Sequence, residues 1–161
     1  MVILSKKRTF IAIVALVFIC SLLALALTII IDNRRSFQLF QHAIDSSKSD
    51  DPVTVTTEFA QYPAGIKCIN AIWVNNSESS IMISLFYSLE KLDGADWIHI
   101  YSPGAVSFQG HGAASGESHE DMYPFSDSLA KGYYRIALSY YEIPGTDFIG
   151  CKDVFAYFAV K

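Results

Sequence analysis

An uncharged apolar run of 22 residues, 10–31, constrains this chain more than any other feature of its sequence. As an α-helix the run would be about 33 Å long, enough to cross a hydrocarbon core of about 30 Å. The sequence therefore predicts one N-terminal transmembrane helix, in contact with the lipid bilayer through residues 10–31. An uncleaved signal anchor is the favoured form. A signal peptide cleaved after Ala26 and a lipoprotein signal ending at Cys20 are alternatives, although the bulky Ile19 is unusual before a lipoprotein cysteine.

Charge on the two sides of the run predicts the orientation of the chain. Residues 1–9 carry three basic side chains and no acidic one, so we expect them to form a cytoplasmic basic tail. From Asp32 onward the chain has 9 basic and 16 acidic residues, a formal charge of −7. Such an acidic part should avoid anionic lipid headgroups and, lacking a basic surface, should not bind nucleic acid.

Residues 32–52 form a predicted juxtamembrane extension and linker. Phe37, Phe40 and Ile44 recur at helical spacing, which indicates that the membrane helix continues for two or three turns. An interfacial or partner-binding helix is an alternative. Residues 45–52 are polar and end in a proline, as is typical of a linker.

From residue 53 to residue 161 the hydrophobic pattern changes to an alternation of period two. About seven short apolar runs follow, separated by turn sequences such as Asp93-Gly94, with almost no helical period. This pattern, over about 110 residues, predicts an all-β sandwich or barrel. The weakest strand signals lie between Ser102 and Asp121, around Val106 and Phe108.

Three ordered motifs carry a family resemblance over roughly residues 54–160. They are Gln61–Lys67 followed by Trp73–Ser77, then Tyr87–Trp97, and finally Lys131–Ile136. Together they resemble an immunoglobulin-like domain family of bacterial surface proteins and lipoproteins. The resemblance implies an immunoglobulin-like β-sandwich outside the cytoplasm of a bacterium, with no catalytic residues to transfer.

Candidate chemical motifs each have a structural interpretation that we prefer. Ser88 and Lys91 match the Ser-x-x-Lys spelling of penicillin-interacting enzymes but lie in a predicted strand, not at a helix start. Residues 110–116 are glycine-rich but precede no helix, so we expect a plain flexible loop. One cluster has metal-ligand residue types without zinc or calcium spacing, and we interpret it as a solvated acidic loop. Its members are His111, Glu117, His119, Glu120 and Asp121.

Two further patterns have both a functional and a structural interpretation. Asn75-Asn76-Ser77 spells a glycosylation acceptor but suits a turn, and the resemblance points to bacteria. A row of aromatic residues could stack on sugar rings, although at strand spacing it is better explained as sandwich core and rim. The row consists of Tyr133, Tyr134, Tyr140, Tyr141, Tyr157 and Phe158.

We therefore expect a non-enzymatic, single-pass protein of a bacterial cell membrane that displays the sandwich as a binding or structural module. It should have no cofactor, no metal ligands and no catalytic residues. An accessory subunit of a membrane transporter or enzyme and a cell-wall carbohydrate-binding module are the alternatives. His42 and His99 are assigned no role.

Four residues give specific structural expectations. Trp73 and Trp97 should be largely buried in the sandwich core. Cys68 and Cys151 should lie toward opposite ends of different sheets, too far apart for a disulfide, which needs Cα atoms within about 7 Å. Cys68 should then serve as a small core hydrophobe.

Overall fold

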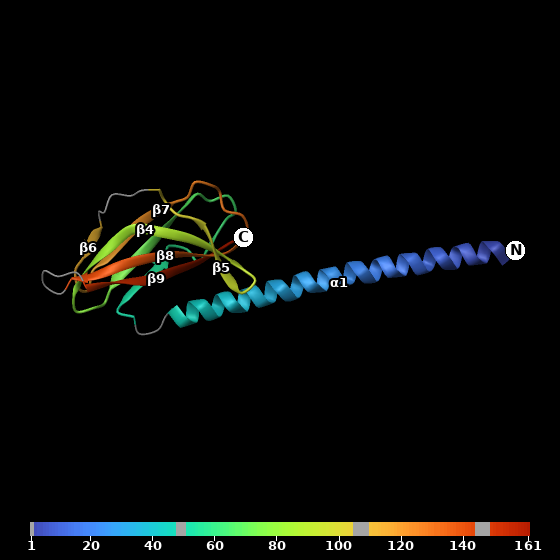
Figure 1. Ribbon diagram of the computed structural model, residues 1–161, viewed down its shortest axis with the longest axis horizontal. Coiled ribbons are helices and arrows are strands. Elements are labelled where there is room, and N and C mark those ends of the chain that lie inside the picture. The colour runs from blue at the N-terminus through green and yellow to red at the C-terminus, as the bar shows by residue number, and fades with distance from the viewer. Residues whose placement is uncertain (1, 48–50, 105–109, 144–148) are drawn as a thin grey trace.

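The computed structural model describes residues 2–47, 51–104, 110–143 and 149–161. Within these residues, one long helix precedes a body of nine strands. Figure 1 shows the helix extending away from the strands. The helix, α1, runs from Val2 to Ser47, so the basic tail is helical as well. The strands are β1 (Val53–Thr57), β2 (Gln61–Tyr62), β3 (Cys68–Asn75), β4 (Ser80–Asp93), β5 (Asp96–Tyr101), β6 (His111–Ala113), β7 (Ser118–Pro124), β8 (Gly132–Ile143) and β9 (Ile149–Val160).

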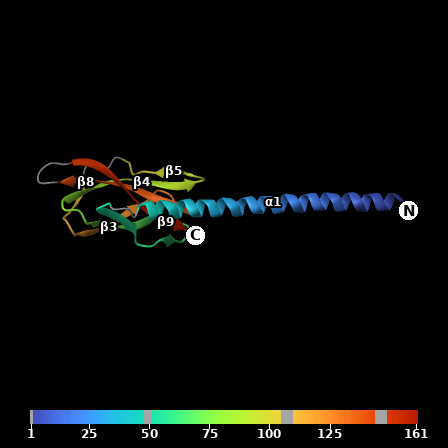
Figure 2. The ribbon, with the colours of Figure 1, turned by 90° about the horizontal axis from the view of Figure 1, so that it is seen from below.

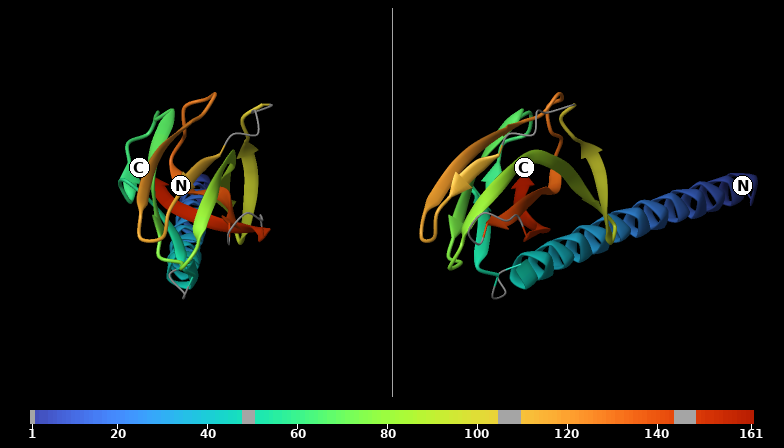
Figure 3. Two further views of the ribbon diagram at one scale, coloured as in Figure 1. Left: turned by 90° about the vertical axis from the view of Figure 1, so that its left-hand side faces the viewer. Right: turned by 60° about the vertical axis from the view of Figure 1, so that its left-hand side comes forward.

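The strands form two sheets that pack face to face (Figure 3). The first sheet has the order β1-β3-β7 and the second the order β2-β9-β8-β4-β5, with β6 paired to the outer edge of β4. This arrangement corresponds to strands A-B-E on one side and G-F-C-C′ on the other in an immunoglobulin domain. The predicted fold, an all-β immunoglobulin-like sandwich behind one N-terminal helix, is therefore confirmed.

The core forms because alternate side chains of each strand point between the sheets. On β3 these are Ile69, Ala71 and Trp73, none more than 2% exposed. The Trp73 indole Nε1–H donates a hydrogen bond to the hydroxyl oxygen of Tyr123 on β7, at 3.0 Å. The expected burial of Trp73 is confirmed.

Two of the expected core residues lie elsewhere. Trp97 is only half-buried, because it lies on the outer face of the second sheet, where the Arg135 guanidinium stacks 4.7 Å from its ring centroid. Cys68 is exposed, because it shares the outer face of β3 with Asn70 and Ile72. Both predictions were wrong: Cys68 alternates with the buried row of β3, and no residue of β5 is fully buried.

Two parts of the cysteine prediction are confirmed, with one change of boundary. Cys68 and Cys151 lie in different sheets and both are free thiols. Cys151 lies inside β9, opposite Tyr141 of β8, and not just before the strand, because pairing with β8 extends β9 back to Ile149. The predicted weak region around Val106 and Phe108 lies outside the described residues.

The last turns of α1 pack on the outer face of the second sheet (Figure 2). Phe40 is 5% exposed, and its ring centroid lies 4.6 Å from that of Tyr133 and 6.3 Å from that of Tyr157. The predicted continuation of the N-terminal helix past residue 31 is thus present, and its apolar side docks on the sandwich. Farther back, the helix segment Val14–Asp45 contains an 18-residue stretch with a mean hydropathy of 3.0, long and apolar enough to cross a membrane.

Candidate metal centre

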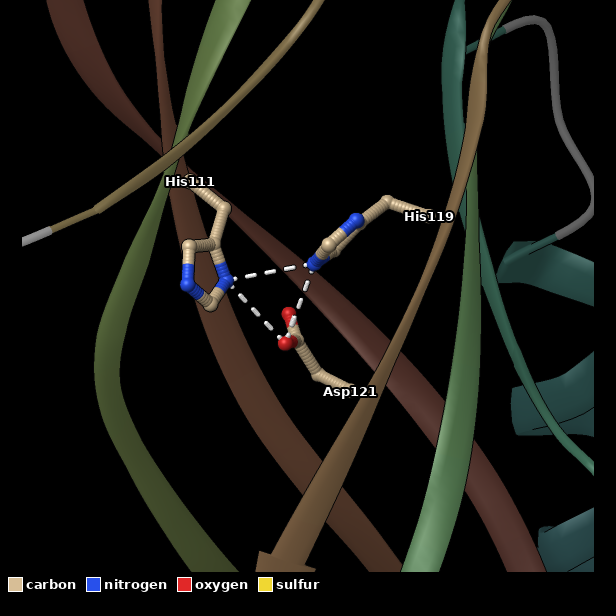
Figure 4. A group of neighbouring side chains, drawn as sticks. All are labelled: His111, His119 and Asp121. Atoms are coloured by element: carbon tan, nitrogen blue, oxygen red, sulfur yellow. Dashed lines mark hydrogen bonds and ion pairs between the residues drawn. The ribbon is translucent and has the colours of Figure 1, made fainter.

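Three potential metal ligands meet where β6 faces β7 (Figure 4). His111 Nδ1 and His119 Nε2 are 3.1 Å apart, and each nitrogen is also 3.1 Å from Asp121 Oδ1. The three atoms therefore form a nearly equilateral triangle. The side chains are 49%, 35% and 14% exposed, in the order His111, His119, Asp121, so the group opens to solvent on the His111 side.

The strand register explains why these side chains converge. His119 pairs with Trp73 and Asp121 with Ala71, so both polar side chains belong to the inward-facing row of β7. His111 pairs with the fully buried Ile83 of β4 and faces inward from the other sheet. Because β6 and β7 are edge strands of opposite sheets, the cluster joins the two layers along their open side.

Hydrogen bonding alone accounts poorly for this triangle. If both imidazoles donate to Asp121 Oδ1, their two N–H groups face each other at 3.1 Å, which is repulsive. If one imidazole donates to the other, that proton is not available to the carboxylate. A single cation bound to all three lone pairs satisfies every member at once.

The ligand separations fit a transition-metal ion. With metal–ligand bonds of about 2.05 Å, ligand atoms lie about 3.3 Å apart in a tetrahedral site and about 2.9 Å apart in an octahedral site. The observed 3.1 Å falls between these values. Two imidazoles and one carboxylate are ligands that zinc and neighbouring divalent metals accept, with at least one position left open.

A buried hydrogen-bonded chain supports Asp121 from behind. The Tyr123 hydroxyl donates to Asp121 Oδ2 at 3.5 Å and accepts from the Trp73 indole. Burial raises the pKa of the Tyr123 hydroxyl well above its usual range, and the charge of Asp121 adds to this effect. Tyr123 therefore stays protonated and orients the carboxylate, as outer-sphere partners do in metal sites.

Asn75 fixes the turn that connects β6 to β7. Its side-chain amide donates to the carbonyl oxygens of Ser79, Ala113 and Ala114, at 2.9–3.1 Å. Its side-chain oxygen accepts from the backbone N–H and the hydroxyl of Ser77. Asn75 is fully buried, so the glycosylation-like motif of residues 75–77 belongs to a turn, as we expected. The network holds His111 and His119 in register.

The interpretation of this segment as a solvated loop was wrong. His111 lies on β6, and His119, Glu120 and Asp121 lie on β7. Glu120 points to the opposite, exposed face, and the Glu117 carboxylate caps the turn by accepting from the Ala114 N–H at 2.8 Å. The signal available in the sequence was the His-x-Asp-x-Tyr alternation of residues 119–123, which a strand turns into one row.

The other candidate motifs of the sequence form no functional site among the described residues. Ser88 and Lys91 lie within β4, as predicted. The expected loop over residues 110–116 instead contains β6. Within the aromatic row, Tyr134, Tyr140 and Phe158 are core residues. Tyr133 and Tyr157 lie beside Phe40 of the helix, so the row forms core and packing contacts, as we favoured.

Comparison with solved structures finds distant likenesses. No family model and no curated protein matches the chain. A CsuC-CsuE chaperone–tip adhesion subunit complex from Acinetobacter baumannii is 16% identical over 67% of this chain and 57% of its own, with a TM-score of 0.40. The periplasmic chaperone SfaE is 13% identical over 68% and 57%, with a TM-score of 0.40. The E. coli chaperone DraB is 8% identical over 66% and 53%, with a TM-score of 0.38. The chain spans a little over half the length of each.

Proposed function

We propose that this chain is a non-catalytic, single-pass protein of a bacterial cell membrane that presents its immunoglobulin-like sandwich outside the cytoplasm as a binding or structural module. The observation that carries the proposal is the 18-residue apolar stretch of the helix, of which the sandwich covers nothing. Its large apolar side chains from Val14 to Ile31 remain 50–65% exposed. An apolar surface of this size requires another cover, and a lipid bilayer supplies one.

Continuity of α1 supports a fixed distance between the sandwich and the bilayer. The apolar run ends at Ile31, and the ring of Phe37, six residues later, lies 6.3 Å from that of Tyr133. At about 1.5 Å per residue, this places the docked sheet within roughly 10 Å of the hydrocarbon boundary. The module would therefore stand close to the membrane, in an orientation set by the helix.

The orientation of the chain is tested with its own cysteines. Cys68 and Cys151 are exposed on the sandwich, whereas Cys20 lies in the apolar helix. A membrane-impermeant maleimide should label Cys68 and Cys151 in intact bacterial cells. In a chain lacking all three native cysteines, Ser5→Cys should react only after lysis.

Three results would contradict the proposal. Reaction of Ser5→Cys in intact cells, with Cys68 and Cys151 protected, would reverse the topology. Release of the chain by alkaline carbonate would exclude an integral helix. A mature mass that lacks residues 1–26 would show a cleaved signal peptide in place of the anchor.

A further inference from the structure

The cluster of His111, His119 and Asp121 is the feature of this molecule that membrane display does not explain. Inward-facing positions of an immunoglobulin-like sandwich are normally apolar, as Trp73, Ala71 and Ile83 are beside this cluster. Two imidazoles and a carboxylate in that row bury less apolar surface at the edge of the core than apolar side chains would. The stabilisation lost in this way needs a compensating interaction.

We propose that the three side chains bind one divalent transition-metal ion, with zinc as the best-fitting candidate. His111 would coordinate through Nδ1, His119 through Nε2 and Asp121 through Oδ1, the three atoms that lie 3.1 Å from one another. Zinc has no geometric preference from its d electrons and accepts nitrogen and oxygen ligands together. The remaining coordination position faces solvent beside the half-exposed His111.

The bound ion would also link the two sheets. His111 belongs to β6 of the second sheet, while His119 and Asp121 belong to β7 of the first. All three cysteines are free, so no disulfide joins the layers. Coordination across the open side of the sandwich would provide such a link, because the ion binds the folded arrangement and not the unfolded chain.

The site is tested by metal titration of the full-length protein in mild detergent. The purification tag must contain no histidine, and bound metal is first removed with a chelator. Wild-type protein should then bind one zinc ion per chain. Cobalt bound at the same site should give visible absorption typical of nitrogen and oxygen ligands.

Ligand variants have closely matched controls in this chain. His119→Gln, His111→Gln and Asp121→Asn should each weaken zinc binding at least about tenfold. His99→Gln removes a histidine of β5 that is hydrogen-bonded to Ser102 and does not belong to the cluster. Glu120→Gln removes a carboxylate next to Asp121 on the opposite face of β7. Both controls should retain affinity within about twofold.

Stability and thiol controls keep the test independent of folding defects. Saturating zinc should raise the unfolding temperature of the wild type but not that of the triple variant His111→Gln, His119→Gln, Asp121→Asn. The double variant Cys68→Ser, Cys151→Ser should bind zinc like the wild type, and X-ray absorption should detect imidazole without sulfur around the ion.

The proposal is overturned by any of three results. These are zinc uptake by the wild type no greater than that of the triple variant, loss of affinity in the controls as large as in the ligand variants, and coordination of the bound ion by sulfur. The first two results would leave the cluster as a hydrogen-bonded contact between sheets.

Discussion

The ring of Phe40, near the end of α1, lies 4.6 Å from the ring of Tyr133 on the outer face of the second sheet. This contact makes the last turns of α1 part of the folded domain. Burial of a phenylalanine side chain is worth about 1.5–3 kcal/mol, so Phe40→Ala should undock these turns. We expect backbone hydrogen exchange of residues 37–45 to rise at least about tenfold, while the core strands keep their protection.

The neighbouring Gln41 provides a control for the docking prediction. Gln41 is exposed on the same helical turn, so Gln41→Ala should leave hydrogen exchange unchanged. Equal protection of residues 37–45 in the wild type and in Phe40→Ala would show that the helix does not need this contact to stay folded against the sheet.

The two tryptophans should differ strongly in their contribution to stability. Trp73 is fully buried and hydrogen-bonded, so Trp73→Ala should cost about 3–5 kcal/mol, a large part of the 5–15 kcal/mol typical of a domain. Trp97 packs on the surface beside Arg135, and Trp97→Ala should cost only about 1 kcal/mol. Calorimetric unfolding of the full-length variants in detergent measures both. Similar losses would contradict the assignment of the two faces.

Local pattern was enough to predict the helix and most strands, because one period dominates each of them. Residues 10–31 are apolar on every side of a helix, and β8 alternates between buried and half-buried residues along its length. The outer-face position of Trp97 was not predictable in this way. The docked helix supplies a second apolar layer, so large apolar side chains occur on both faces of the second sheet.

The candidate metal centre was hidden for a different physical reason. β6 has only three residues, of which only Ala113 is buried, so no hydrophobic period indicates a strand there. Its position depends on pairing with β4 and on the side chain of Asn75, 38 residues before the carbonyl of Ala113 that it binds. Contacts at that sequence separation leave no local pattern. The segment that contains His111 and His119 therefore resembled a polar loop in the sequence.

Asn75 should tolerate almost no substitution. Asn75→Asp keeps the shape of the side chain but places a carboxylate oxygen against three carbonyl oxygens that now accept hydrogen bonds. A buried charge without donors should cost at least about 3 kcal/mol. Asn76 is the adjacent, exposed asparagine, and Asn76→Asp should change stability by no more than about 0.5 kcal/mol. Thermal unfolding distinguishes the two, and equal stabilities would show that the amide donors of Asn75 are dispensable.

Two glycines beside His111 provide a test of how closely β6 must approach β4. A Cβ atom at Gly110 would lie 2.5 Å from the carbonyl oxygen of Ile83 and 2.7 Å from side-chain atoms of Met82. Gly110→Ala must therefore push β6 away from its partner and move the next residue, His111. At Gly112 the nearest atom would be 3.9 Å away, an ordinary contact. We expect Gly110→Ala to weaken zinc binding at least about tenfold and Gly112→Ala to leave it within about twofold. Equal zinc affinities in the two variants would mean that the ion does not depend on the placement of His111 by β6.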